Sequence, residues 1–329
     1  MRVGLTGGAG FIGGHIIEAL VTRGHQVTVF DHQGRIDPQI MLGLDPYDRD
    51  AITVMLGDVR DSTAVTELAA HVDGIIHLAA VLGTQETIGN PRPSAETNIL
   101  GSLNVFEAAA QYGLPVAYAG VGNHWMREHG AGSYTISKTA AEDFARMFNA
   151  YRGGRISIVR PVNAYGPRQS VAAPYGSSKV RKVLPAMACR ALTGTPIEVY
   201  GDGTQISDCV YVTDVAAAFT AALEQTRASI KAPAKPIEVG PADSVTVNDI
   251  ARVVAACAAK LTGRDPVEIK HLPMRPGEVP NSVVSANVTT LAQIGLDAAQ
   301  FTPLHEGVAV TVEWYARNWL PGYLGKAVA

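Results

Sequence analysis

The chain has 329 residues, of which 47% are hydrophobic and 17% charged, and its formal net charge is -3. This length and composition are typical of a folded protein that buries a large core and divides into two lobes, not of a disordered chain. The near-neutral charge balance gives no electrostatic reason to expect nucleic acid or an anionic membrane as a partner.

The first residues predict a unit that binds a dinucleotide. A buried strand at 2–6 is followed by the glycine-rich stretch 7–13, a helix over 14–22 and a strand at 27–31. Strand, glycine turn, helix, strand and a closing acid, in this order, are the layout of a dinucleotide-binding βαβ unit.

The glycines of this stretch have separate tasks. Gly7 permits the tight turn, Gly10 lets backbone N–H groups approach a pyrophosphate, and Gly13 lets the helix pack close to the strand. The helix then faces the phosphates with the positive end of its dipole.

The acid that closes the second strand predicts which dinucleotide binds. Asp31 would accept hydrogen bonds from the adenosine ribose hydroxyls and would repel a 2′-phosphate. NAD is therefore favoured over NADP, while His32 and Arg35 leave NADP open as the alternative.

The alternation of strands and helices continues along the chain. Further strands are expected at 53–56, 74–80, 115–119 and 155–160, with helices over 62–70, 97–112 and 137–151. Repeated βα units of this kind predict an α/β fold with a Rossmann-type doubly wound parallel sheet. We expect Asp58 beside the adenine and residues 77–80 along the cofactor. His77 is interpreted as a hydrogen-bonded histidine at a strand end, not as a catalyst.

Two segments contain Tyr-x-x-x-Lys, a spacing that places a phenol and an ammonium group one helical turn apart. Tyr134 and Lys138 follow the strand at 115–119 and open a helix, so they arrive at the sheet edge where ligands collect. Tyr175 and Lys179 lie in a Pro/Gly/Ser-rich stretch that suits a substrate-facing loop. The first pair is therefore predicted to be the chemical one.

Several motifs together carry a family resemblance. They are Thr-Gly-Gly-Ala-Gly-Phe-Ile-Gly at 6–13, His-Leu-Ala-Ala at 77–80, Tyr-x-x-x-Lys at 134–138, Asn-Ala-Tyr-Gly-Pro at 163–167, Tyr-Gly-Asp-Gly-Thr-Gln at 200–205, Val-Tyr-Val-Thr-Asp-Val-Ala at 210–216 and Arg-Pro-Gly-Glu at 275–278. The chain resembles the extended short-chain dehydrogenase/reductase superfamily, and within it the NAD-dependent nucleotide-sugar epimerases and dehydratases of the UDP-glucose 4-epimerase type. The resemblance covers nearly the whole chain.

The resemblance implies a mechanism. Tyr134 would act as base on a sugar hydroxyl while the nicotinamide takes hydride from the same carbon, which gives a 4-keto sugar. Lys138 and the positive nicotinamide would lower the tyrosine pKa from its usual value near 10. Lys138 would also hold the nicotinamide ribose. NAD would be regenerated in each cycle.

The implied site residues form three sets, and no metal site is expected. The catalytic residues are Tyr134, Lys138 and Asn123. The cofactor-binding residues are Gly7, Gly10, Phe11, Ile12, Gly13, Asp31, His32, Asp58, Val59, Leu78, Ala79, Ala80, Asn98, Tyr134, Lys138 and Pro161. The residues that bind the nucleotide-diphosphate sugar are Thr84, Asn123, Asn163, Arg168, Lys179, Val183, Tyr200, Ser207 and Arg275.

The chain departs from the family pattern at the reacting centre. The family places a Ser or Thr after the strand that precedes the tyrosine, but here this position is Val121. Asn123 or Thr84 would have to donate the missing hydrogen bond, and losing such a donor typically costs about two or three orders of magnitude in rate. The connection to Tyr134 is also shorter than the family usually has.

Two further departures concern the substrate. An Arg-Asp pair is common where this chain has Ser207-Asp208, so one nucleotide contact is missing or is supplied by nearby basic residues, namely Arg168, Lys179, Arg181 or Lys182. Sugar 4,6-dehydratases carry an Asp-Glu pair where this chain has Gly122-Asn123, which argues against that elimination. Glu86 and His124 remain as replacements for the missing acids.

The leading hypothesis is an NAD-dependent nucleotide-sugar epimerase that acts at C4. The alternatives are dehydration, decarboxylation or net oxidation through the same 4-keto intermediate, or a non-catalytic NAD-binding regulator. The expected domains are an NAD-binding domain over 1–167, with a returning segment near 205–231, and a smaller C-terminal nucleotide-sugar-binding α/β lobe over 168–329.

The remaining expectations concern location and assembly. Apolar stretches are broken well short of the roughly 20 residues that a membrane span needs, and the N-terminus lacks a signal-peptide layout. The three cysteines are far apart, which favours a reduced, cytoplasmic setting. The helices at 97–112 and 137–151 occupy the positions that pair in family dimers, so a homodimer is expected.

Overall fold

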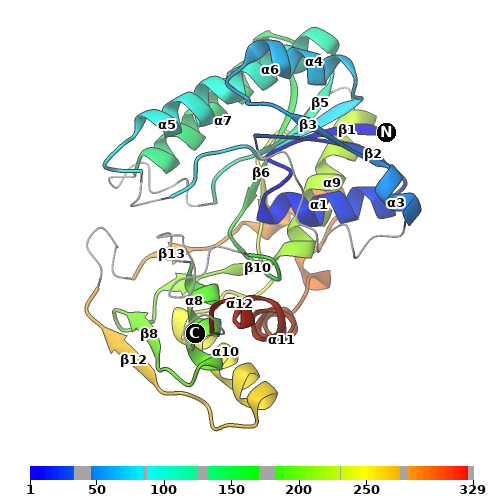
Figure 1. Cartoon of the computed structure of the whole chain (residues 1–329). Helices are drawn as coiled ribbons and strands as arrows, with labels where there is room; N and C mark the ends of the chain where they lie inside the picture. The colour runs from blue at the N-terminus through cyan, green and yellow to red at the C-terminus, as the bar shows by residue number, and fades with distance from the viewer. Residues whose placement is uncertain are drawn as a thin grey trace. The chain divides into compact units, whose positions relative to one another are not determined.

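In the computed structural model, the chain folds into two compact units (Figure 1). The first comprises Met1–Pro161, Thr213–Val239 and Asn287–Asp297, and the second comprises Val162–Val212, Gly240–Ala286 and Ala298–Ala329. The structure describes residues 1–32, 46–83, 87–122, 124, 132–169, 182–229, 231–274 and 281–324.

These bounds differ from the domain limits expected from the sequence. The first unit ends at Pro161 instead of residue 167, and two segments return to it, where one near 205–231 was expected. The returning segment Thr213–Val239 ends with the edge strand at 237–239, which is too short to be recognised from alternation alone.

A seven-stranded parallel sheet forms the centre of the first unit. The strand order is β11-β6-β5-β4-β1-β2-β3, and every neighbouring pair is parallel. The strands are β1 (Arg2–Thr6), β2 (Gln26–Asp31), β3 (Ile52–Leu56), β4 (Gly74–His77), β5 (Pro115–Ala119), β6 (Arg155–Pro161) and β11 (Ile237–Val239). Because the order reverses between β1 and β4, the carboxyl ends of these two strands flank the switch point where such sheets bind ligands. The predicted Rossmann-type fold is confirmed.

Helices cover both faces of this sheet (Figure 1). Residues of α4, α6 and α7 share one apolar cluster with strand residues, whereas α1 and α9 lie on the opposite face. The helices of the unit are α1 (Phe11–Thr22), α3 (Pro46–Asp50), α4 (Ser62–Ala70), α5 (Arg92–Ser94), the π-helix η1 (Ala95–Gly101), α6 (Ser102–Tyr112), α7 (Ser133–Tyr151), α9 (Val212–Ala228) and the 3-10 helix η3 (Val288–Ile294).

The helix expected over 97–112 is a composite in the structure. A short α-turn from Arg92 and a π-helix at Ala95–Gly101 lead into α6, which ends at Tyr112 and is capped by Gly113 with φ of 63°. π-Helical turns are rare and often occur at functional sites. Here the π-turn carries Asn98, one of the predicted cofactor residues.

The second unit has its own core and three two-stranded parallel ladders. These pair β7 (Asn163–Tyr165) with β10 (Cys209–Tyr211), β8 (Ile197–Tyr200) with β12 (Ile269–Leu272), and β9 (Ile206–Ser207) with β13 (Val283–Val284). Its helices are α8 (Val183–Leu192), α10 (Val247–Thr262), α11 (Leu304–Trp314) and α12 (Pro321–Leu324), with η4 (Ala298–Gln300) and η5 (Tyr315–Trp319). α8, α10 and α11 share one apolar cluster.

Candidate active site

The glycine loop after β1 is shaped by close approach of the backbone. Gly7 has φ of +70°, and a Cβ atom there would lie 2.7 Å from the amide nitrogen of Ala79. A Cβ at Gly13 would lie 2.5 Å from the carbonyl oxygen of Gly8. Both positions therefore require glycine for the loop to fit between β1, α1 and the segment after β4.

The N-terminus of α1 is suited to a phosphate. Its N-cap is Gly10, in an extended conformation, and within the described chain no side chain caps this end. Phe11 and Ile12 form the first turn, which contains no acid. The free N–H groups and the helix dipole therefore point at the position that a pyrophosphate would take.

Asp31 lies against this loop as the sequence predicts. Its Oδ2 accepts the amide N–H of Ala9 at 3.1 Å, and its side chain is 6% exposed at the end of β2. Nδ1 of His32 lies 3.2 Å from the other carboxylate oxygen. The glycine cradle, the uncapped helix and the acid together fit NAD. Arg35, which left NADP open as the alternative, lies outside the described residues.

The loop gives a direct test of the cofactor site. Gly7→Ala is expected to weaken NAD binding roughly tenfold or more, because about 1.4 kcal/mol of strain in the bound loop is enough for that change. Gly24 is a matched control, since its φ is +76° and nothing lies within 4 Å of a Cβ there. Gly24→Ala should cost only about 1 kcal/mol of folding stability. Isothermal titration with NAD checks both variants, and equal affinities would contradict the prediction.

Asp58 and Val59 follow β3 at the carboxyl edge of the sheet, where Asp31 ends β2. Arg60 contacts both carboxylate oxygens of Asp58, at 2.6 and 3.0 Å, and holds the pKa of that carboxyl below its ordinary value. Val59 is buried, and its carbonyl oxygen accepts a hydrogen bond from Asn104 at 2.9 Å. Arg60 is not among the residues predicted from the sequence.

His77 ends β4 inside a network of hydrogen bonds. Its Nδ1 lies 2.6 Å from Oγ1 of Thr6, and its Nε2 lies 3.0 Å from Oγ of Ser102. Burial lowers the pKa of His77 to about 3, with a smaller contribution from the charge of Lys138. The histidine is therefore neutral and has partners on both nitrogens, which agrees with the interpretation of a strand-end residue.

The three residues after His77 run beside the glycine loop. Leu78 donates its N–H to the carbonyl oxygen of Thr6 at 3.0 Å, and the Ala79 N–H points to the Thr6 hydroxyl at 3.4 Å. Ala80 follows directly and is partly exposed. The segment that the sequence predicts along the cofactor thus lies at the switch point of the sheet.

Asn98 connects the segment after β4 to α7. Its amide oxygen accepts the N–H of Val81 at 2.8 Å, and its amide nitrogen donates to the Val81 carbonyl at 3.1 Å and to Oγ of Ser137 at 2.9 Å. Ser137 in turn donates to the carbonyl oxygen of Tyr134 at 2.9 Å. Asn98 therefore positions the start of α7 relative to the sheet.

α7 carries Tyr134 and Lys138 one turn apart. The tyrosine is half-buried, and the lysine is 2% exposed. Burial raises the pKa of Tyr134 to about 12, and the charge of Glu142 adds to that rise. Burial lowers the pKa of Lys138 to about 7, although Glu142 opposes this fall. Without cofactor the tyrosine is thus a neutral phenol, and the lowered pKa expected with the positive nicotinamide bound beside it stays a prediction.

Glu142 is the residue that the sequence reasoning missed. It is 1% exposed, lies one turn beyond Lys138 on α7, and accepts two hydrogen bonds from Nε of Arg160, at 3.0 and 3.1 Å. The Arg160 NH2 group also donates to it. The Tyr-x-x-x-Lys-x-x-x-Glu spacing along one helical face was the available signal.

The same carboxylate fixes the turn at the end of β5. The N–H of Val121 donates to Oε1 of Glu142 at 3.1 Å, and a Cβ on Gly120 would collide with that oxygen. Val121 is 4% exposed and has no hydroxyl to offer to a ligand. Asn123 and Thr84, the predicted substitutes, lie outside the described residues. Pro161 ends β6 and is partly exposed.

The predicted substrate residues that the structure describes lie in the second unit. Asn163 donates to Oγ of Ser207 at 3.1 Å and to the carbonyl oxygen of Asp208 at 2.9 Å, so the structure brings Asn163 and Ser207 together. Tyr200 ends β8, and Val183 is the first residue of α8. Arg168 follows β7 with φ of 67°, whereas Lys179 and Arg275 lie outside the described residues.

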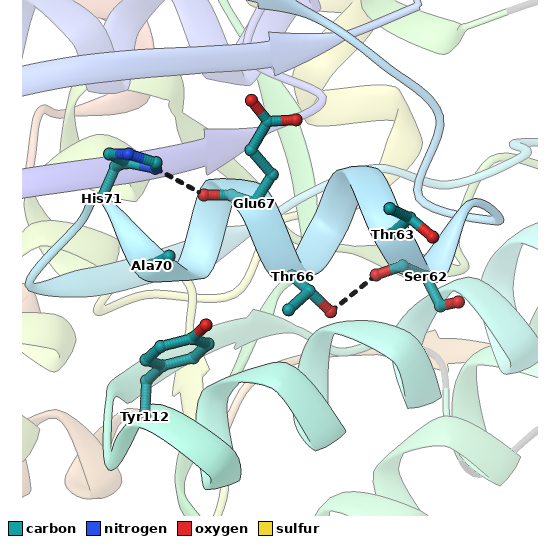
Figure 2. A pocket seen from close by; sticks show the side chains of 7 residues that line it. All are labelled: Ser62, Thr63, Thr66, Glu67, Ala70, His71 and Tyr112. Atoms are coloured by element: carbon teal, nitrogen blue, oxygen red, sulfur yellow. Dashed lines mark hydrogen bonds between the residues drawn. The ribbon is translucent and has the colours of Figure 1, made fainter.

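A shallow surface hollow of about 480 Å³ lies along α4 (Figure 2). His71 follows α4, and Tyr112 ends α6, so these two walls adjoin the amino ends of β4 and β5. The hollow is therefore not at the carboxyl edge where the glycine loop and α7 meet. Its lining residues are Ser62, Thr63, Thr66, Glu67, Ala70, His71 and Tyr112.

Neither a metal-binding cluster nor a membrane-spanning helix occurs among the residues that the structure describes. In that part of the chain, no cluster of three or more His, Cys, Asp or Glu side chains could hold a metal ion. No helix within the described ranges has the length and apolar character needed to cross a bilayer.

Comparison with known proteins places this geometry in a family. Residues 3–235 match the model of the NAD dependent epimerase/dehydratase family. A UDP-N-acetyl-alpha-D-glucosaminuronate decarboxylase from Bacillus cytotoxicus is 30% identical, over 94% of this chain and 96% of that protein. A dTDP-glucose 4,6-dehydratase from Mycobacterium tuberculosis is 27% identical, over 98% of this chain and 96% of that protein.

Solved structures of nucleotide-sugar epimerases share the fold of this chain. The UDP-glucose 4-epimerase of Thermus thermophilus, solved in complex with NAD, superposes with a TM-score of 0.75 at 29% identity, over 97% of this chain and 100% of that one. The family model covers more than half of the chain and confirms the resemblance drawn from its motifs. The chain belongs to the NAD-dependent epimerase/dehydratase family, and its cofactor is NAD.

Proposed function

We propose that the chain is a nucleotide-sugar epimerase that acts through a 4-keto intermediate, in the simplest case at C4. The observation that carries this proposal is the Tyr134/Lys138 pair on α7, in the same unit as a glycine loop and Asp31 that fit NAD. The likeness to UDP-glucose 4-epimerases from Thermus thermophilus and Thermotoga maritima, at 29% and 26% identity, supports the choice of reaction.

The chemistry assigned to the chain is a proton transfer. Tyr134 removes the proton of the sugar 4-hydroxyl while the C4–H bond breaks, and it returns that proton after the keto sugar has turned over. NAD, when bound, supplies the acceptor of the hydride and gives the hydride back. A phenol with a pKa near 12 is a poor base at neutral pH, so its ionisation needs nearby positive charge. Lys138 and the positive nicotinamide ring of bound NAD would provide that charge.

A decarboxylase is the second candidate. The UDP-N-acetyl-alpha-D-glucosaminuronate decarboxylase that is 30% identical to this chain favours it. Oxidation at C4 of a sugar that carries a C6 carboxylate gives a β-keto acid, which loses carbon dioxide and takes up a proton. The same Tyr134 and Lys138 would serve that reaction. The absence of an Asp-Glu pair at Gly122-Asn123 argues against a 4,6-dehydratase.

The nucleotide diphosphate is assigned to residues of the second unit. Arginine suits phosphate oxygens because its planar fork donates two parallel hydrogen bonds. Asn163 is already hydrogen-bonded to Ser207, so this pair would contact the nucleotide as one group. The proposed residues of the second unit are Asn163, Arg168, Lys179, Val183, Tyr200, Ser207 and Arg275, and Thr84 and Asn123 are proposed as donors to the reacting sugar oxygen.

A homodimer is also proposed, because the chain has the two helices that pair in dimers of this family. Leu100 of η1 and Ile136 and Phe144 of α7 are exposed apolar side chains on the helices expected to pair. Sedimentation that shows only monomer at working concentration would contradict this assembly.

Proton NMR of the purified protein with NAD and a panel of nucleotide sugars tests the function. The panel contains UDP-, GDP-, CDP- and dTDP-hexoses and their C6-carboxylate forms. A new anomeric signal without accumulated NADH supports epimerisation, and a pentose product with release of carbon dioxide supports the decarboxylase. No turnover across the panel, with NAD bound, would favour a non-catalytic regulator and would point to Val121.

A further inference from the structure

The ammonium group of Lys138 packs against the face of an aromatic ring. Its Nζ atom lies 4.3 Å from the centroid of the Tyr118 ring, and both side chains are buried, at 2% and 0% exposure. The Tyr118 hydroxyl lies 3.5 Å from the backbone carbonyl oxygen of the same lysine, at the long end of hydrogen-bond distances. One tyrosine of β5 thus contacts both ends of one residue of α7.

We propose that Tyr118 is a positioning residue for Lys138, whose ammonium group it holds on its ring face and whose backbone it fixes through its hydroxyl. The proposal rests on the function proposed above, because it gives Lys138 its part in the reaction. An ammonium group so far removed from water needs a compensating partner, and an aromatic face supplies one through its quadrupole.

The Tyr118 ring is itself held in place by neighbours from other elements. His77 of β4 stacks on it, with centroids 5.5 Å apart and an interplanar angle of 30°. Phe106 of α6 meets it edge-on, at 5.3 Å and 87°. Because these neighbours fix the position of the ring, the ring determines where the lysine ammonium group lies.

The charges around Lys138 come from the elements packed against it. Tyr134 and Glu142 lie one turn before and one turn after it on α7, and Arg160 of β6 pairs with Glu142. His77 of β4 is neutral, because burial lowers its pKa to about 3.

These surroundings set the direction in which Lys138 responds to a change in the ring. Burial lowers the pKa of Lys138 to about 7, and Glu142 acts against this fall. A ring face that favours the charged ammonium also raises the lysine pKa. Removal of the face should therefore lower that pKa further.

The experiment titrates Lys138 directly in the full-length protein, with no nucleotide sugar present. Lysine is labelled with ¹³C at Cε, the Lys138 signal is assigned with a Lys138→Met variant, and its chemical shift is followed from pH 5 to pH 11. Spectra are recorded without added cofactor and again with saturating NAD. Tyr118→Leu is expected to lower the apparent pKa of Lys138 by about one unit.

Two further variants separate ring face, hydroxyl and packing. Tyr118→Phe keeps the face and removes the hydroxyl, so the lysine pKa should stay within a few tenths of a unit of the wild-type value. Phe106→Leu disturbs the packing on Tyr118 without removing a contact to Lys138, and should leave that pKa unchanged. If Phe106→Leu lowers the pKa as much as Tyr118→Leu does, loosened packing is the cause and the proposal is wrong.

A shape-preserving comparison covers the case in which Tyr118→Leu does not fold. Tyr118→3,4,5-trifluorophenylalanine keeps the ring but reduces the negative charge on its face, and should lower the lysine pKa relative to Tyr118→Phe. Equal pKa values for these two variants would overturn the proposal. The titration does not depend on turnover. A substrate panel without product therefore contradicts the proposed function alone, and an unchanged lysine pKa contradicts the positioning role alone.

Discussion

Tyr134→Phe is expected to lower the turnover of the nucleotide sugar by two to four orders of magnitude, the range that a positioned general base typically contributes. The variant removes only the phenolic oxygen. The glycine loop and Asp31, which are assigned to NAD, are unchanged, so NAD affinity should fall by no more than about tenfold, the loss that one cofactor hydrogen bond of Tyr134 would cause. Turnover is measured by NMR on the substrate found in the panel, and NAD binding by calorimetry.

The chain offers two controls for this variant. Tyr151 lies at the other end of α7 and is 83% exposed, so Tyr151→Phe makes the same chemical change on the same helix and should leave turnover unaltered. Tyr175 opens the second Tyr-x-x-x-Lys motif, and Tyr175→Phe tests whether the wrong tyrosine was chosen. Full turnover in Tyr134→Phe together with loss in Tyr175→Phe would reverse that choice. A non-catalytic regulator would keep its function in both.

The parts of the site that could be predicted from sequence are those built from neighbours in the chain. The turn at Gly7, the close approach at Gly13 and the acid that ends β2 follow from one βαβ unit, and the structure places all three together. The pairing of Tyr134 with Lys138 follows from helical spacing in the same way. Local geometry sets these contacts, and periodicity is enough to locate them.

The contacts that were missed join residues far apart in the chain. Glu142 and Arg160 are buried on different elements, and nothing in either local pattern says that they meet. The π-turn carries Asn98, whose side chain bonds back to Val81, and the helical segment begins before the residue 97 that helical spacing predicted. The raised pKa of Tyr134 comes from burial, which the residue pattern around the motif does not reveal.

Glu142→Gln is expected to lower the free energy of unfolding by about 3 kcal/mol, because it leaves the buried Arg160 guanidinium without its main counter-charge. The arginine is 8% exposed, and its remaining acidic neighbour in the described chain is Glu238, 3.6 Å away and itself partly exposed. The glutamine keeps an oxygen for the N–H of Val121, but its NH2 group cannot accept a hydrogen bond from Arg160, so the loss reports the missing charge together with that one acceptor. Denaturant unfolding monitored by circular dichroism provides the measurement.

A double variant shows that the loss belongs to the ion pair. Glu142→Gln combined with Arg160→Met removes both charges, and it should be more stable than Glu142→Gln alone by about 1 to 3 kcal/mol. Asp143→Asn is the surface control, since Asp143 is 53% exposed on the same helix and pairs with the half-exposed Arg146. That change should stay within about 0.5 kcal/mol of wild type. If the double variant is no more stable than Glu142→Gln, the buried charge of Arg160 is not what destabilises the single variant. The carboxylate would then act mainly by packing under the Gly120–Val121 turn at the end of β5.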